Sequence, residues 1–152
     1  MRKMVLIAIF LVLVLVASTA FAWSVLFVSK SLPSSCNVGS SSTFRAKIKY
    51  DSRVGGIPLP ITGCFHVEIP RRYKLPTVVS GSWGSWQFTA KTGAMTGKST
   101  WEGKKEFTVF GEIQRTARFS AVANKKGKSQ SYIGTGPKVL TGADYYKGVT
   151  IK

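Results

Sequence analysis

Alternation of apolar and polar side chains constrains this chain more than any other feature of its sequence. From Phe44 to Tyr50, apolar or aromatic side chains occupy every second position and alternate with Arg45, Lys47 and Lys49. Successive side chains of a β-strand point to opposite faces of the sheet. The period of two therefore predicts a strand with one buried face and one basic face.

Similar alternation recurs along the rest of the chain. Further strands are predicted at residues 61–69, 86–90, 107–114 and 117–124, with weaker candidates at 23–28, 131–133 and 138–140. Turns are predicted at residues 54–56, 80–82, 92–93, 102–103 and 124–128, the last as a hairpin loop with Gly127 at positive φ. After residue 22, no helical i, i+3, i+4 stripe persists for ten residues.

Seven or eight short strands with turns between them predict an all-β fold. The expected architecture is an antiparallel β-sandwich with an Ig-like or fibronectin-like Greek key topology, after an N-terminal signal segment. A jelly roll or a small barrel is the alternative. Such folds carry many unrelated activities, so the fold alone assigns no function.

The N-terminal segment, residues 1–22, has the layout of a secretory signal peptide. Arg2 and Lys3 precede an apolar run that ends near residue 17, and Ala20 and Ala22 provide the small residues of a cleavage site. Cleavage before Trp23 would leave residues 23–152 as a single β-sandwich domain, secreted or in the cell envelope, and would lower the net charge from +16 to +14. The alternative is a retained membrane anchor, because apolar residues resume at 23–28 and the combined stretch is long enough to span a bilayer.

Cys36 and Cys64 are the only two cysteines. Export would deliver them to an oxidising compartment, so they are expected to form a disulfide. By the chain-entropy treatment, such a bridge would contribute roughly 3.6 kcal/mol. His66 shares a strand face with Cys64, but this spacing aims the two side chains poorly for thiol catalysis.

The residue types that carry most enzyme chemistry are scarce. One His, six Asp plus Glu and no Gly-x-Ser-x-Gly motif leave no visible catalytic set, and no metal site or cofactor is predicted. His66 and Glu68 share a strand face, yet this spacing is common by chance, and the interpretation is an exposed polar face. A carbohydrate-active protein would have to draw its acids from Glu68, Glu102, Glu106 and Glu112.

The excess of basic residues is the strongest remaining feature. With 22 Lys plus Arg against 6 Asp plus Glu, the surface is expected to attract an anionic polymer, a membrane surface or an acidic partner protein. Export argues against an intracellular nucleic acid. The candidate binding surface combines basic segments expected in loops with two tryptophans. Its residues are Arg71, Arg72, Lys74, Lys104, Lys105, Lys125, Lys126, Lys128, Trp83 and Trp101.

Three other interpretations remain open. Dispersed lysines can simply keep a sandwich soluble and protect its edge strands. The chain could be a structural or assembly subunit of a surface apparatus, or a small protein acting on cell-wall carbohydrate. Whether Trp83, Trp86 and Trp101 lie in the core or on the surface is also left open by the sequence, and so is the oligomeric state.

Overall fold

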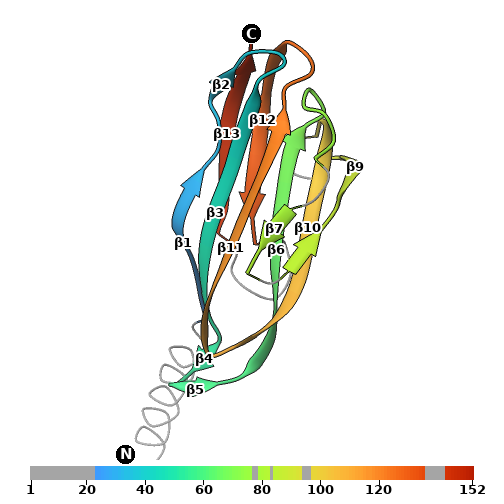
Figure 1. Cartoon of the computed structure of the whole chain (residues 1–152). Helices are drawn as coiled ribbons and strands as arrows, with labels where there is room; N and C mark the ends of the chain where they lie inside the picture. The colour runs from blue at the N-terminus through green and yellow to red at the C-terminus, as the bar shows by residue number, and fades with distance from the viewer. Residues whose placement is uncertain (1–22, 77–78, 83, 94–96, 136–142) are drawn as a thin grey trace, which may run out of the picture.

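The computed structural model describes residues 23–76, 79–82, 84–93, 97–135 and 143–152, and every regular element in these ranges is a β-strand. The strands form two sheets that pack face to face as an elongated sandwich (Figure 1). The five-stranded sheet has the order β1 (Ser24–Ser31), β3 (Ser41–Asp51), β11 (Glu112–Val122), β7 (Val79–Gly81) and β8 (Gly84–Trp86). The six-stranded sheet has the order β2 (Ser35–Cys36), β13 (Asp144–Ile151), β12 (Gly127–Gly134), β6 (Pro60–Pro70), β10 (Ser99–Phe110) and β9 (Phe88–Thr92).

A short hairpin of β4 (Arg53–Val54) and β5 (Ile57–Pro58) lies at one end of the sandwich (Figure 1). The sequence predicted a turn at residues 54–56, and the structure places Gly55 and Gly56 there, both at positive φ. The strand pairs are antiparallel apart from β13 with β2, which is parallel. The predicted all-β sandwich is therefore confirmed at the level of fold class.

The core lies between the two sheets and follows the predicted alternation. Phe44 and Phe119 are register partners on β3 and β11, and their rings stack at 4.7 Å, while Tyr73 packs edge-on against Phe44. On β3, alternate residues from Ser42 to Tyr50 are buried, and the basic residues between them are exposed or half-buried. The period-two prediction is confirmed for this strand.

The strand β6 departs from the simple alternation. Its core-facing residues are buried as expected, but Cys64, His66 and Glu68 on the opposite face are buried too. The interpretation of His66 and Glu68 as an exposed polar face was wrong. The reason is that β6 is a central strand, and neighbouring strands place Glu102 and Tyr132 directly beside Glu68.

Three turn or loop predictions fail because β10 is long and because β11 and β12 belong to different sheets. Residues 102–103 lie within β10, where Gly103 has no room for a side chain: a Cβ would meet the Trp86 indole at 2.6 Å and the Phe88 ring at 3.1 Å. Lys104 and Lys105, expected in a loop, lie on the same strand. Residues 124–128 cross from one sheet to the other and are not a hairpin, although Gly127 does have positive φ (140°).

The sequence analysis missed β13 altogether. Its inward-facing residues begin with Tyr145 and end with the buried Val149 and Ile151. Between them stand Lys147, on the inward-facing side, and Gly148, which has a low strand propensity. These two residues interrupt the pattern that would have revealed the strand.

The expected disulfide is also wrong for this structure: Cys36 and Cys64 are not bonded to each other. Cys36 pairs with β13 at one end of the six-stranded sheet, whereas Cys64 lies well down β6. The register through β13, β12 and β6 separates them by about nine residues along the strands, roughly 30 Å at the usual rise per residue. A disulfide requires Cα atoms within about 7 Å. The Sγ atom of Cys36 instead lies 3.5 Å from the hydroxyl of Tyr73.

Some predictions fall on residues outside the described ranges. These are the signal segment at 1–22, the weak strand at 138–140 and Trp83. Among the residues that are described, none belongs to a helix with the length and apolar character needed to cross a membrane.

Candidate functional site

Basic residues from three separate segments meet in an open groove at one end of the six-stranded sheet. The groove has a volume of about 420 Å³ and lies where β6 ends and where β10 and β12 begin. Its described lining contains five cationic side chains and no acidic one. The lining residues are Pro70, Arg71, Arg72, Lys98, Ser99, Lys125, Lys128 and Ser129.

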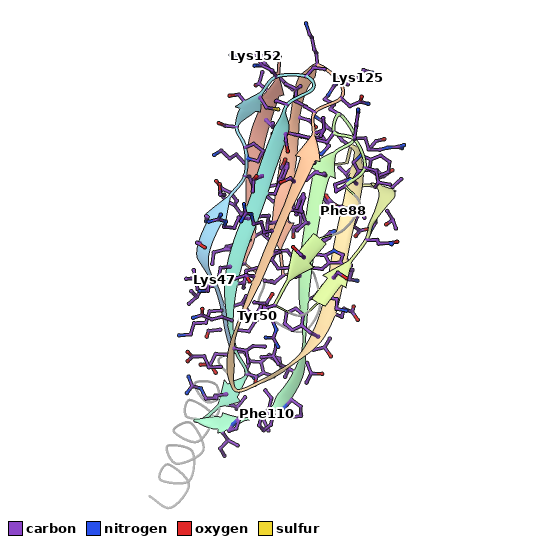
Figure 2. All side chains as sticks on the ribbon, viewed as in Figure 1. Lys47, Tyr50, Phe88, Phe110, Lys125 and Lys152 are labelled. Atoms are coloured by element: carbon purple, nitrogen blue, oxygen red, sulfur yellow. The ribbon has the colours of Figure 1, made fainter. Side chains whose placement is uncertain are left out.

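The register of the sheet brings these segments together. Thr100 of β10 pairs with Pro70 of β6, so Lys98 and Ser99 approach the arginines that follow β6. On the other side, β12 runs antiparallel to β6, which brings Lys128 close to the same end. Figure 2 shows Lys125 at the same end of the sandwich as the C-terminal Lys152.

Arg72 fixes one wall of the groove. Its guanidinium donates a hydrogen bond to the carbonyl of Lys126, and its own carbonyl accepts from the backbone N–H groups of Asn124 and Lys125 at 2.6 and 2.9 Å. The connection between β11 and β12 is thus folded around this one arginine. Gly127 permits the close packing, because a Cβ there would lie 2.5 Å from the Arg72 guanidinium carbon.

Arg71 is held at the groove by an aromatic ring. Its guanidinium carbon lies 4.7 Å from the ring centroid of Trp101, a cation–π contact. The Trp101 indole is in turn fixed by a hydrogen bond of 2.8 Å from Nε1 to the carbonyl of Tyr73. Trp101 is half-buried and one face of its ring contacts the Arg71 guanidinium. It is therefore neither a fully buried core residue nor a freely exposed one.

The groove collects four of the predicted candidate residues: Arg71, Arg72, Lys125 and Lys128. Lys98 was missed, since an isolated lysine beside a glycine gives no signal in the sequence. The remaining lysines of the candidate surface do not line the groove. They are Lys74, Lys104, Lys105 and Lys126.

A second basic surface lies on the outer face of the five-stranded sheet. Arg45 and Arg118 are register partners there, and with Lys47 they line a hollow of about 330 Å³. Figure 2 places Lys47 beside β3, well away from Lys125. This second surface is also basic but lies far from the groove, so it provides a control for the groove.

The buried outer face of β6 carries a compact polar cluster. His66 Nε2 lies 2.8 Å from Glu102 Oε1 and 3.6 Å from Glu68 Oε1, and Lys91 Nζ lies 2.9 Å from the same Glu102 oxygen. The Tyr132 ring packs edge-on against the imidazole with its centroid 5.3 Å away.

The surroundings of this cluster control its protonation. Burial lowers the pKa of His66 below its usual range, against the opposing effect of the Glu102 carboxylate, and thereby favours a neutral imidazole. The hydrogen bond to Glu102 raises the pKa of Lys91. The sequence showed that His66 and Glu68 share a face, but Glu102 joins them only through the pairing of β10 with β6.

The candidate acids for carbohydrate chemistry are dispersed or enclosed. Glu106 faces Lys104 at 3.4 Å, and Glu112 contacts Lys49 and Arg53 at the far end of β11. Glu68 and Glu102 stand side by side, yet Glu68 is fully buried. None of these acids lines either of the two basic grooves described above.

Comparison with known proteins gives no family. No model of a protein family matches the chain, and no curated protein matches it. Among solved structures, it is similar to AvmM, which catalyses macrocyclization in alchivemycin A biosynthesis (10% identity, 86% of this chain and 89% of that chain, TM-score 0.44). It is also similar to a cohesin module of a family 33 glycoside hydrolase from Clostridium perfringens (8% identity, 87% and 99%, TM-score 0.43).

A third similar structure is a family 123 glycoside hydrolase from Clostridium perfringens that acts on glycolipid glycans (11% identity, TM-score 0.34). The likeness covers 88% of this chain but 27% of the hydrolase. At these identities and scores, none of the three similarities carries a functional argument.

Proposed function

We propose that this protein is an exported, non-catalytic binding domain whose cationic groove contacts an anionic polymer. The observation that carries the proposal is the convergence of five cations from three segments of the chain around one groove with no acid in its described lining. Like charges that lie this close repel one another unless an anion neutralises them. A polymer that presents several phosphate, sulfate or carboxylate groups would do so at several points at once.

The way in which the arginines are held supports this role. Arg71 rests on Trp101, and the turn at residues 124–127 is folded around Arg72, so both guanidinium groups are positioned before a ligand arrives. Ordering a long side chain on binding costs about 0.5–1.5 kcal/mol. Groups that are already ordered avoid that cost, and Arg is well suited to phosphate and carboxylate oxygens because it donates in a planar fork.

The finer fold assignment is part of the same proposal. The strand orders β1-β3-β11-β7 and β13-β12-β6-β10 correspond to the A-B-E-D and G-F-C-C′ sheets of an Ig-like sandwich. They support an Ig-like Greek key in which β7 and β8 come before β10 along the chain. Export rests on the signal layout of residues 1–22. An intact mass that matches residues 23–152 would establish that the signal segment is removed.

The test is equilibrium binding of the protein that starts at Trp23 to fluorescent duplex DNA, to a sulfated polysaccharide and to vesicles containing an anionic phospholipid. For duplex DNA, each neutralised phosphate contributes about −0.9 to the slope of log K against log salt, so five contacts predict a slope near −4.5. Lys125→Ala with Lys128→Ala should reduce the slope to about −2.7. If each lysine contributes about 1 kcal/mol, the affinity should fall roughly 30-fold.

The matched control is Lys47→Ala with Arg118→Ala, which removes the same charge from the other basic surface. This variant should keep most of the affinity. Equal losses for the two double variants would show that only the net charge matters and would refute the groove as the site. Binding to vesicles alone would identify a membrane surface as the partner, and retention of no probe at low salt would leave the charge as a solubility feature.

A further inference from the structure

We infer that His66, Glu68 and Glu102 form a binding site for one divalent transition-metal ion of the Zn²⁺ class, separate from the cationic groove. The three side chains each offer one ligand atom, and these atoms all lie within 4.8 Å of one another. In the described part of the chain, they are the one group of three or more His, Cys, Asp or Glu residues that meets this condition.

The spacing of the ligand atoms suits a metal. Zn²⁺ binds His nitrogen and carboxylate oxygen at about 2.0–2.2 Å, and tetrahedral geometry then places neighbouring ligand atoms about 3.4 Å apart. His66 Nε2 is 2.8 Å from one carboxylate oxygen and 3.6 Å from the other. The set therefore needs only small side-chain movements to enclose an ion.

The backbone holds the three residues rigidly. His66 and Glu68 are two residues apart on β6 and so share a face, and Glu102 is the register partner of Glu68 on β10. All three sit on strands inside the six-stranded sheet, with partners on both sides. Sites built on such elements keep their ligand geometry better than sites on loops.

Burial provides the second, independent observation. His66 is 6% exposed, and its Nε2 atom is enclosed. Within the described residues, this atom makes no hydrogen bond of good geometry, although Glu102 Oε1 is only 2.8 Å away. The nitrogen thus points into the carboxylate pair without a well-directed bond to it. A metal ion would bind this nitrogen together with one oxygen of each carboxylate.

The ligand set selects among metals. One imidazole nitrogen with two carboxylate oxygens suits Zn²⁺, Co²⁺, Mn²⁺ or Fe²⁺, whereas Ca²⁺ and Mg²⁺ prefer oxygen ligands alone. Lys91 is the internal competitor, because its ammonium group contacts the Glu102 oxygen that would bind the ion. Lys91 is on edge strand β9 and its side chain is 46% exposed, so the ammonium group can move into solvent when a metal binds.

The test is titration of the protein that starts at Trp23 with Co²⁺ followed by visible absorption, and with Zn²⁺ followed by calorimetry. We expect one ion per chain and a rise in the melting temperature. Loss of a ligand should weaken binding at least about tenfold, as loss of an outer-shell partner alone does at known sites. His66→Gln and Glu102→Gln are the ligand variants, and far-UV circular dichroism checks their fold.

Two further variants separate this site from general charge effects. Glu106→Gln removes a carboxylate that lies on the same strand and face as Glu102 but outside the cluster. This variant should bind the metal ion as tightly as the unmodified chain does. Lys91→Met should bind the metal more tightly, because it removes the competing ammonium group while keeping an unbranched apolar chain. Absence of saturable binding, or equal affinity in His66→Gln, would show the cluster to be an ion-pair network only and would overturn the inference.

Discussion

The substitution Gly127→Ala tests how one wall of the groove is built. Gly127 has φ of 140°, a region that is nearly closed to residues with a Cβ, and the added methyl group would lie 2.5 Å from the Arg72 guanidinium. The guanidinium must therefore move, and it loses its hydrogen bond to the Lys126 carbonyl. Arg72→Ala removes that hydrogen bond directly while keeping the backbone bonds from Asn124 and Lys125 to the carbonyl of residue 72.

The cost can be estimated for each step. Strain at positive φ, reduced by the lower entropy of the unfolded Ala chain, amounts to about 1.5 kcal/mol, and the lost hydrogen bond adds about 1 kcal/mol. Gly127→Ala should thus cost about 2.5 kcal/mol and Arg72→Ala about 1 kcal/mol. The double variant should also cost about 2.5 kcal/mol, since the hydrogen bond can be lost only once. The predicted coupling is about 1 kcal/mol, beyond the usual additivity error of about 0.5 kcal/mol.

The assay is urea unfolding of the four proteins, with the free energy of unfolding taken by linear extrapolation. The reasoning would be refuted if the stability losses of the two single variants added up to the loss of the double variant. That result would mean that Gly127 and Arg72 do not share one packing constraint. Binding to an anionic probe adds a second readout. Gly127→Ala should weaken it, since the displaced guanidinium no longer faces the groove.

Three further predictions concern stability and chemistry. Burial lowers the pKa of His66, so the unfolded chain binds a proton at this imidazole more readily than the folded chain does. The contribution of His66 to the free energy of unfolding should therefore be fully present above about pH 6.5. It should fall as the pH drops below that value, by at most about 1.4 kcal/mol per pH unit. Urea unfolding between pH 7.5 and 5 checks this, and an equal slope in His66→Gln would contradict it. Thiol titration of the denatured protein should find two thiols, since Cys36 and Cys64 lie far apart, and a count of zero would show a bridge that this structure does not have. Phe44→Ala should cost about 3–5 kcal/mol in urea unfolding, because the ring is fully buried between Tyr73 and Phe119, and a cost below 1 kcal/mol would show that the core is packed differently.

The sequence predicts those strands that have one apolar and one polar face. For β3, every second side chain enters the core, so the local pattern contains the answer. For β6 the alternation locates the strand but does not reveal that its polar face is buried, because the burial of His66 and Glu68 depends on neighbouring strands that are distant in the sequence. The strand β13 was missed because Lys147 interrupts its apolar side and the neighbouring Gly148 has a low strand propensity.

The candidate groove was likewise only partly predictable from the sequence. Arg71 with Arg72, and Lys125 with Lys128, are short basic segments that can be read directly from the sequence. That these segments face each other follows from the order β12-β6-β10, and this pairing is set by contacts between residues far apart in the chain. Lys98 enters the groove only through that pairing. The disulfide prediction failed for the same reason, since the number of cysteines says nothing about their distance.

Chemical footprinting of lysines tests most directly whether anions bind in the groove. The protein would be acetylated briefly, with and without polyphosphate at low salt, and the modification of each lysine read by mass spectrometry. The account predicts protection of Lys98, Lys125 and Lys128 by polyphosphate, with Lys47 modified to the same extent in both samples. Equal protection of all four lysines, or protection of Lys47 alone, would contradict it.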